Sequence, residues 1–287
     1  MEKKIRLAII GGSGLYNIDG LTATKEYNPQ TPFGLPSAPI IVGTLEDQRV
    51  AFLARHGIGH HLMPTEVPYR ANIYALKSLG VERIVSISAC GSLREDYAPG
   101  HIVVPDQLYD NTKNRPRTFF DEGIVAHIGA ADPFCGELSN QLEDAARAAS
   151  ATVHHGGTFI TIEGPRFSTK AESNTYRSWG MSIIGMTAAP EAFLAREAEM
   201  CYAVMAHVTD YDVWHVSEMP VSVEIVVQTL NKNTAIAQEA IRHLIRTLKL
   251  ERSCYCDAAL SNAIITRREN ISKEARKKLD LLIKKYY

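Results

Sequence analysis

Apolar positions along the chain fall into short continuous runs and longer segments with helical spacing. The short runs, rich in Val, Ile and Leu, predict strands at 5–10, 39–43, 49–54, 81–88, 101–105, 152–162, 182–187 and 202–209. Helical spacing predicts helices at about 64–79, 136–149, 169–180, 190–199, 221–248 and 272–286, with a loop-rich stretch over 106–133. Because strands and helices alternate, we predict an α/β fold with a mixed, mostly buried sheet flanked by helices.

No composition shift or linker divides the 287 residues. We therefore expect a single domain over 1–287, in which about 249–287 form a C-terminal helical extension. Two helix starts have clear signals. Thr169-Lys-Ala-Glu172 has the form of a capping box, and Pro190 suits the first turn of its helix.

The strand predicted at 202–209 ends in two carboxylates, Asp210 and Asp212. Ligands of open α/β sheets bind beyond the carboxyl ends of strands. Alternate residues of an extended segment point the same way, so both carboxylates are expected to face one spot. The structural alternative is that one carboxylate caps the next segment and the other is solvated.

Other predicted strands also end in small or polar groups. Ser13 follows the first strand in a glycine-rich turn, Arg55 and His56 follow the third, Ser88 and Ala89 end the fourth, and Thr187 ends a later one. Hydroxyls, an arginine and turn N–H groups at one sheet edge would suit a phosphate. Taken singly, an Arg-His pair at a strand end is usually a surface feature, and Ser88 is often only a turn former.

Several familiar motifs are absent or incomplete. The turn after the first strand has Asn17 where a dinucleotide fingerprint needs its third glycine, and the sequence holds no P-loop and no G-x-S-x-G elbow. Gly57 and Gly59 lie between His56 and the pair His60-His61, and they disfavour the helix that a zinc site with ligands one turn apart would need. We therefore predict no metal and no cofactor.

Charge and hydropathy exclude further classes. Lys and Arg number 31 against 32 Asp and Glu, so no strong field favours nucleic acid or a membrane surface. No apolar run approaches the roughly 20 residues of a membrane span, and the N-terminus lacks the features of a signal peptide. A cytoplasmic protein is expected.

The five cysteines divide into two groups. Cys90, Cys135 and Cys201 lie in or near predicted core elements and are expected to be small buried hydrophobic residues. Cys254 and Cys256, in a polar connector, could form a strained disulfide or a redox pair. In a reducing cytosol two free thiols are expected.

The motifs together resemble the 5'-methylthioadenosine phosphorylases of the trimeric purine nucleoside phosphorylase family. The resemblance rests on Gly11-Gly-Ser-Gly-Leu, Thr31-Pro-Phe-Gly, Leu53-Ala-Arg-His-Gly, Ala71-Asn-Ile-Tyr-Ala-Leu-Lys, Ala89-Cys-Gly-Ser-Leu-Arg-Glu, Ile162-Glu-Gly-Pro-Arg-Phe-Ser, Met186-Thr-Ala-Ala-Pro-Glu and Thr209-Asp-Tyr-Asp. It covers nearly the whole chain to about residue 248. It implies one α/β domain with a partly barrel-like mixed sheet, assembly as a homotrimer, and reversible phosphorolysis of an N-glycosidic bond.

The resemblance also assigns roles to residues. Phosphate, the co-substrate, is expected to contact Ser13, Arg55, His56, Ser88, the backbone of Ala89, and Thr187. Phe167, Ser168, Asp210 and Asp212 are expected to line the base site, Met186 to pack under the ribose, and Val223 and Val226 to face the methylthio group, with His127 supplied by a neighbouring subunit. Some members carry a Cys-x-Cys at the position of Cys254 and Cys256.

Chemistry agrees with these roles. A purine leaves poorly as an anion, so a protonated Asp210 is expected to donate to N7, and two close carboxylates in a dry pocket are expected to share a proton. Arg55 is expected to hold phosphate bidentately and, with Asp210 and Asp212, to be catalytic. Carboxylates accept from the N6 amino group of adenine and repel the O6 of an oxopurine. The apolar Val223 suits a thioether better than a 5'-hydroxyl.

Three alternatives remain from sequence. A broader 6-aminopurine phosphorylase would also use adenosine. A non-catalytic nucleoside sensor would have no need of the residues predicted to bind phosphate. A nucleoside hydrolase would need a water-activating group, often with Ca²⁺, and no aspartate-rich N-terminal motif of that kind occurs.

Overall fold

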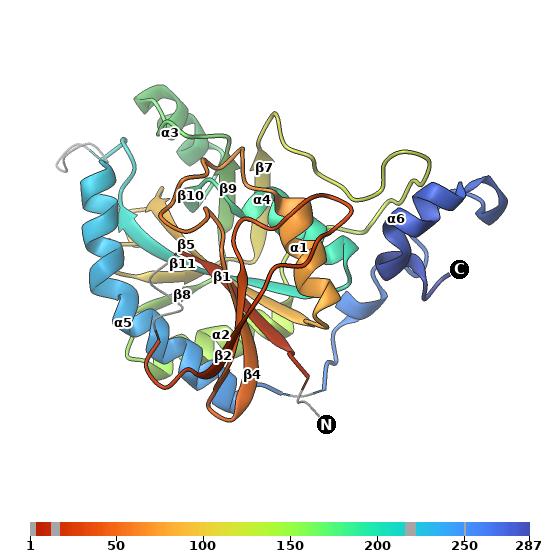
Figure 1. The fold of residues 1–287 in the computed structure, drawn as a ribbon. Coiled ribbons are helices and arrows are strands. Elements are labelled where there is room, and N and C mark those ends of the chain that lie inside the picture. The colour runs from red at the N-terminus through yellow and green to blue at the C-terminus, as the bar shows by residue number, and fades with distance from the viewer. Residues whose placement is uncertain (1–3, 13–17, 216–221, 250) are drawn as a thin grey trace.

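The computed structural model describes residues 4–12, 18–215, 222–249 and 251–287, which form one 11-stranded mixed sheet with helices on both faces (Figure 1). The strands are β1 (Leu7–Gly11), β2 (Thr22–Tyr27), β3 (Ile40–Leu45), β4 (Gln48–Ala54), β5 (Arg83–Ser92), β6 (Ile102–Val104), β7 (Gln107–Asn111), β8 (Val153–His155), β9 (Thr158–Ile162), β10 (Ile183–Gly185) and β11 (Cys201–Asp210). The helices are α1 (Tyr69–Ser78), α2 (Gly136–Ala148), α3 (Lys170–Ser178), α4 (Ala188–Glu197), α5 (Val223–Thr247) and α6 (Lys273–Ile283).

The sheet branches at β5. Its order is β2-β3-β4-β1-β5-β10-β9-β7, and a second arm runs from β5 through β11 and β6 to β8. The long β5 pairs in parallel with β1 and β11, and antiparallel with β10 at its carboxyl end. Since β1 also pairs in parallel with β4, the carboxyl ends of β4, β1, β5 and β11 meet at one edge.

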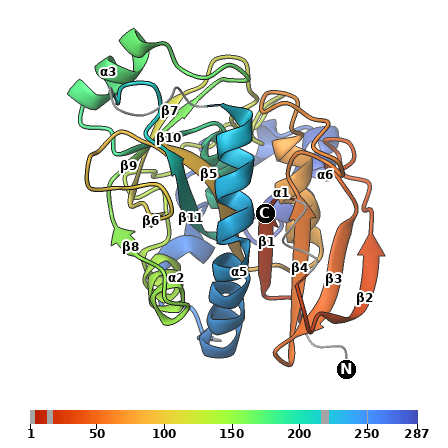
Figure 2. The ribbon, with the colours of Figure 1, turned by 90° about the vertical axis from the view of Figure 1, so that its left-hand side faces the viewer.

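Both faces of the central sheet are buried. Along β1, Leu7 and Ile9 pack in one hydrophobic cluster with α2 and α5, whereas Ala8 and Ile10 pack in another with α1, α4 and α6. Figures 1 and 2 show α5 lying along one face and α1 and α6 on the opposite side. This two-sided burial explains why the central strands are continuous apolar runs in the sequence.

The predicted α/β class is confirmed, and most strands and helices lie within a few residues of their predicted positions. The sequence-based reading missed β2 and β7. The strand β2 is an edge strand whose TATKEY residues are nearly all exposed, so it has no apolar pattern to detect. The single strand predicted over 152–162 is two strands, β8 and β9, because Gly156 and Gly157 both have positive φ and interrupt the extended backbone.

Both predicted helix starts are confirmed. Thr169 and Glu172 form the reciprocal bonds of a capping box at the start of α3. In α4, Ala189 has a non-helical backbone, as the residue before a proline prefers, so regular helix begins at Pro190.

The C-terminal extension packs on the core. Ala275, Leu279, Leu282 and Ile283 of α6 are buried in the same cluster as α1 and α4. Among the described residues, no helix is both long enough and apolar enough to cross a membrane.

Candidate active site

A cavity of about 890 Å³ lies at the shared carboxyl edge of β4, β1, β5 and β11. Its wall includes Gly12 after β1, Arg55 after β4, Ser88 in β5 and Asp210 at the end of β11, and α5 contributes Val223 and residues of its next turns. Strands far apart in the sequence therefore bring their polar ends to one space. The predicted convergence at a strand edge is confirmed.

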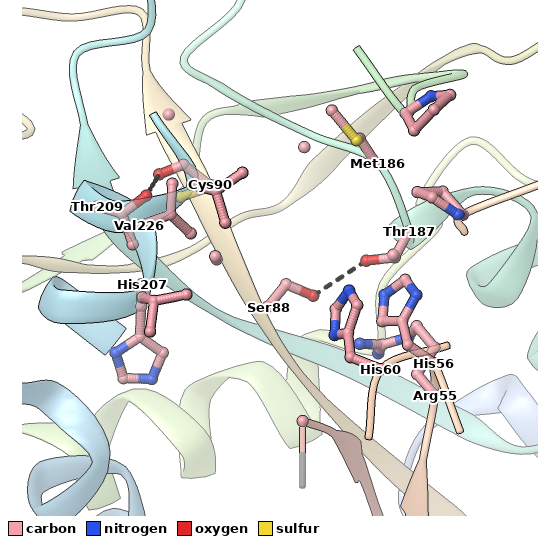
Figure 3. Close-up of a pocket in the computed structure, with 18 of the residues that line it drawn as sticks. Arg55, His56, His60, Ser88, Cys90, Met186, Thr187, His207, Thr209 and Val226 are labelled. Atoms are coloured by element: carbon pink, nitrogen blue, oxygen red, sulfur yellow. Dashed lines mark hydrogen bonds between the residues drawn. The ribbon is translucent and has the colours of Figure 1, made fainter. Parts of the chain in front are cut away.

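One end of the cavity carries hydroxyls and imidazoles (Figure 3). The Oγ of Ser88 lies 3.3 Å from the Oγ1 of Thr187, which immediately precedes α4. The ring of His56 stacks on that of His60, with centroids 4.3 Å apart. Arg55, Ala89 and Gly12 line the same cavity. This group, called the anion end below, comprises Arg55, His56, Ser88, Ala89 and Thr187. The remaining predicted member, Ser13, lies outside the described residues.

The guanidinium of Arg55 is committed to a carboxylate. Its Nε and Nη2 each donate to a different oxygen of Glu191 at 2.8 Å, and both side chains are almost fully buried. Burial lowers the pKa of Arg55, but the Glu191 carboxylate outweighs this and raises it above its ordinary value. The predicted bidentate binding of phosphate by Arg55 is therefore wrong, because Glu191 occupies Nε and Nη2. A buried arginine without a counterion would be costly, which explains this pairing.

Some capacity for an anion remains on Arg55. Nη1 carries two hydrogens and donates to the carbonyl of Ile87 at 3.2 Å, which leaves one hydrogen available among the described residues. Glu191 also accepts from the hydroxyl of Tyr202 at 2.7 Å. The ion pair therefore provides a fixed donor with little net charge.

His56 is held as a neutral acceptor. Its Nδ1 lies 2.9 Å from the carbonyl oxygen of Leu62, so Nδ1 carries the proton and Nε2 is left as an acceptor. Burial, followed by the charge of Arg55, lowers the pKa of His56 to about 4. Neutral His56 can therefore accept a hydrogen bond from a protonated phosphate oxygen without taking its proton.

At the other end of the cavity lie the carboxylates of Asp210 and Asp212, called the base end together with Thr209, Phe167 and Ser168. One oxygen of Asp210 accepts the backbone N–H of Asp212 at 2.8 Å, and the other lies 2.6 Å from the hydroxyl of Thr209. Burial, with a smaller contribution from Asp212, raises the pKa of Asp210 to about 6. Burial also raises the pKa of Asp212.

Thr209 lies between Asp210 and the carbonyl of Cys90, 3.2 Å away (Figure 3). Its single proton cannot serve both acceptors. When Thr209 donates to Cys90, its oxygen can accept from a protonated Asp210. The hydroxyl thus supports either protonation state of the carboxyl group.

The two carboxylates reach the cavity by a different route from the one predicted. The strand β11 ends at Asp210, with a register irregularity between Val208 and Asp210, and Asp212 has a left-handed backbone with φ 51°. The prediction that the two side chains alternate along an extended segment is therefore wrong, although both residues line the cavity. The close approach of Asp210 depends on Gly91, where a Cβ would lie 3.0 Å from an Asp210 oxygen.

The other residues predicted for the substrate mostly line this cavity. They are Phe167, Ser168, Met186, Val223 and Val226. Among the described residues, Ser168 Oγ and Asp212 Oδ2 are buried without a hydrogen-bond partner, and both residues line the cavity. His127 is exposed, lies outside the cavity lining, and donates its backbone N–H to the carbonyl of Ala263.

Sequence reasoning missed several residues of this site. Glu191 had a detectable signal, because it is the only acid in the apolar stretch Ala188–Ala195 and Arg55 needs a partner. His207 and Asn233 also line the cavity, and both ring nitrogens of His207 lack a hydrogen-bond partner among the described residues. Burial lowers the pKa of His207 to about 4. A histidine inside an apolar strand was the available signal for it.

Comparison with known proteins agrees with the geometry. The Phosphorylase superfamily profile matches residues 6–246. The S-methyl-5'-thioadenosine phosphorylase of Geobacter sulfurreducens is 54% identical over 281 residues, covering 98% of each chain, and that of Koribacter versatilis is 51% identical, covering 98% of this chain and 96% of its own.

Solved structures show the same relationship. A methylthioadenosine phosphorylase from an Antarctic soil metagenomic library superposes with a TM-score of 0.93 at 47% identity, covering 98% of this chain and 99% of its own. The Schistosoma mansoni methylthioadenosine phosphorylase in complex with adenine gives a TM-score of 0.83 at 35% identity, covering 93% and 100%. The chain therefore belongs to the phosphorylase superfamily and, within it, to the S-methyl-5'-thioadenosine phosphorylases.

Proposed function

We propose that the protein catalyses the reversible phosphorolysis of 5'-methylthioadenosine to adenine and 5-methylthioribose 1-phosphate. The observation that carries this proposal is the single cavity with an anion end and a base end. A reaction in which phosphate attacks a sugar carbon while a purine leaves needs both ends at once. A nucleoside sensor or a hydrolase would have no use for the anion end.

At the anion end, the hydroxyls of Ser88 and Thr187 and the spare Nη1 hydrogen of Arg55 would donate to phosphate oxygens. Neutral His56 would accept a hydrogen bond from a protonated phosphate oxygen through Nε2. The Arg55–Glu191 pair has little net charge, so its main role would be to position the phosphate nucleophile rather than to attract it electrostatically. Ser13 and the backbone of Ala89 are proposed to complete this end.

In the reaction, a phosphate oxygen forms a bond to C1' of the ribose as the bond from C1' to N9 of the purine breaks. The electron pair of that bond passes into the purine, and a proton from Asp210 at N7 neutralises it. Burial raises the pKa of Asp210 to about 6, which keeps a usable fraction protonated near neutral pH. Asp212 is proposed to accept from the N6 amino group, which favours adenine over an oxopurine.

Substrate choice at the sugar end follows from α5. Val223 and Val226 present apolar surface to the cavity and offer no partner to a 5'-hydroxyl. A thioether has no hydroxyl group to leave unsatisfied. We therefore propose that methylthioadenosine is preferred over adenosine. Met186 would pack under the ribose between the two ends.

A homotrimer is proposed as the active form. His127 is exposed and outside its own cavity, although the resemblance assigns it to the methylthio group. Val125 and Ile265, joined by a backbone hydrogen bond two residues before His127, are exposed apolar side chains. These features suit a surface that a neighbouring subunit covers.

Adenine release from methylthioadenosine, followed by absorbance with and without added phosphate, tests the proposal. We expect release to depend on phosphate and to be faster for methylthioadenosine than for adenosine at equal concentration. Equal rates in phosphate-free buffer would replace phosphorolysis by hydrolysis.

A further inference from the structure

Four of the five cysteines converge at a point outside the cavity. The sulfurs of Cys135, Cys201, Cys254 and Cys256 all lie within 4.8 Å of one another. They come from three segments: Cys135 immediately precedes α2, Cys201 begins β11, and Cys254 and Cys256 lie at the 3₁₀ turn η2 (Tyr255–Ala258). Three are buried, Cys254 is half-buried, and none is in a disulfide.

The spacing of the sulfurs suits one tetrahedral ion. A metal–sulfur bond of about 2.3 Å places the four ligands of a tetrahedron about 3.8 Å apart. The sulfurs of Cys201 and Cys254 are 3.4 Å apart, and 4.8 Å is the limit for every pair. We propose that these four cysteines bind a structural zinc ion as thiolates.

The surroundings of the cluster favour thiolate ligands. Zn²⁺ with four thiolates carries a net charge of −2, which needs nearby cations or N–H donors. The Nη1 of Arg196 lies 3.6 Å from the sulfur of Cys256, and the positive charge of Arg252 interacts with Cys201. Two guanidinium groups thus offset the two excess negative charges.

The position of the cluster indicates a structural rather than a catalytic ion. Four protein ligands leave no open position for a substrate or water. Cys201 begins β11 and Asp210 ends it, so roughly 30 Å of extended strand, at about 3.3 Å per residue, separates the ion from the base end. Through Cys254 and Cys256 the ion would tie the C-terminal extension to the start of α2 and of β11. This role is independent of the proposed reaction.

The same four sulfurs could instead form disulfides or hold iron. The sulfur spacing alone excludes neither of these, but Cys256 and Cys201 are buried beside the guanidinium groups of Arg196 and Arg252, which favours a charged complex over neutral disulfides. The test therefore measures the metal and the thiols in the same sample.

The test uses full-length protein that is purified under reducing conditions with zinc present. A weak chelator then removes loosely bound metal, and the metal content of the protein is measured. We expect about one zinc ion per chain, released as an organomercurial reagent titrates the thiols. Replacement by cobalt should give the intense visible bands of a tetrahedral thiolate site. Cys254→Ser and Cys256→Ser should reduce zinc to below about 0.1 per chain, and Cys90→Ser, the cysteine outside the cluster, should not.

Stability and activity should separate in the Cys254→Ser variant. Its Tm should fall by at least about 5 °C, whereas kcat/KM measured well below that temperature should stay within about twofold of the wild type. Three results for the wild-type protein would overturn the proposal. They are less than about 0.1 zinc per chain, iron in place of zinc, or native disulfides found by mass spectrometry. Full zinc retention by both serine variants would also overturn it.

Discussion

At the scale of single residues, the site depends on environment more than on residue type. Arg55 and Glu191 are both almost fully buried and satisfy one another, so neither acts as a simple surface charge. Asp210 is a carboxyl group whose pKa burial raises to about 6, and His56 is an imidazole whose pKa burial lowers to about 4. Near neutral pH the carboxyl group can therefore hold a proton, whereas the imidazole stays neutral and can accept a hydrogen bond. Their pKa values lie in the opposite order from those of an ordinary carboxyl group and imidazole.

Asp210→Asn tests whether this residue reads the base. Asparagine can donate to O6 or N7 but cannot release a proton to the leaving purine. We expect kcat/KM for methylthioadenosine to fall at least tenfold, or about 1.4 kcal/mol of transition-state stabilisation, and the loss for methylthioinosine to be smaller. Adding Ser168→Glu, which could accept from N1–H of an oxopurine, should move the preference further. An unchanged ratio between the two nucleosides, with an unchanged Tm, would refute the role.

The pH dependence of the wild type follows from the same carboxyl group. Because the reactive form of Asp210 is protonated and its pKa is about 6, kcat/KM for methylthioadenosine should decline as pH rises above that value. The slope should approach a factor of about ten per pH unit. The Asp210→Asn variant should lack this decline. A wild-type profile that rises through pH 6 to 8 would mean that the ionised form is the active one.

Glu191 is predicted to position Arg55 for phosphate. Glu191→Gln removes the charge partner, so we expect the KM for phosphate to rise strongly and stability to fall, by about 3–5 kcal/mol if the guanidinium stays buried and unpaired. Glu197 on the same helix provides a matched control. It is also buried, with its pKa raised to about 7 mainly by burial, and Glu197→Gln should leave the phosphate KM unchanged. Similar KM values in the two variants would count against the positioning role.

At the scale of elements, what the sequence could predict depends on where an element lies. The central strands are buried on both faces, so their apolar runs marked their positions and their polar ends marked the site. The edge strand β2 carries no apolar pattern and was missed. Asp210 and Asp212 both line the cavity, as predicted, but not because they alternate along an extended strand. The chain bends after β11 at Asp212, whose left-handed backbone no periodicity predicts.

Contacts between distant elements account for the remaining differences. Glu191 is 136 positions from Arg55, and the four clustered cysteines span residues 135–256, so only the folded chain brings them together. Ser13, one of the predicted phosphate contacts, lies outside the described residues. Local signals such as the capping box at Thr169 were reliable because both partners lie within one turn.

The first turns of α5 are predicted to set the preference at the sugar 5' position. Val226→Thr keeps the shape of the side chain and adds a hydroxyl that can pair with the 5'-OH of adenosine. We expect the ratio of kcat/KM for methylthioadenosine over adenosine to fall about fivefold, or roughly 1 kcal/mol. Val125→Thr, an exposed valine outside the cavity lining, is the control. A ratio that does not change in Val226→Thr would place the 5' group elsewhere.

At the scale of the whole molecule, the structure combines a sheet buried on both faces with a site whose parts come from at least six elements. The C-terminal extension is packed on this core through α6 and reaches the cysteine cluster through η2. The exposed His127 and its apolar neighbours Val125 and Ile265 are features that a single subunit does not explain.

Subunit mixing tests whether His127 acts across an interface. His127→Ala and Asp210→Asn should each lower methylthioadenosine turnover as homotrimers. In mixed trimers, some sites combine the intact Asp210 of one subunit with the intact His127 of its neighbour, so activity should recover above the average of the two variants. Sedimentation of the wild type provides the control. A fully active monomer, or no recovery on mixing, would contradict the proposed assembly.

The central claim is that one cavity brings phosphate and a purine nucleoside together for a single displacement. Phosphorus NMR of the protein with methylthioadenosine and inorganic phosphate tests it most directly, because it follows the new bond itself. The account predicts one sugar 1-phosphate ester for each adenine released, with both lost together in an Arg55→Ala variant. Adenine released with free methylthioribose and no phosphate ester would contradict it.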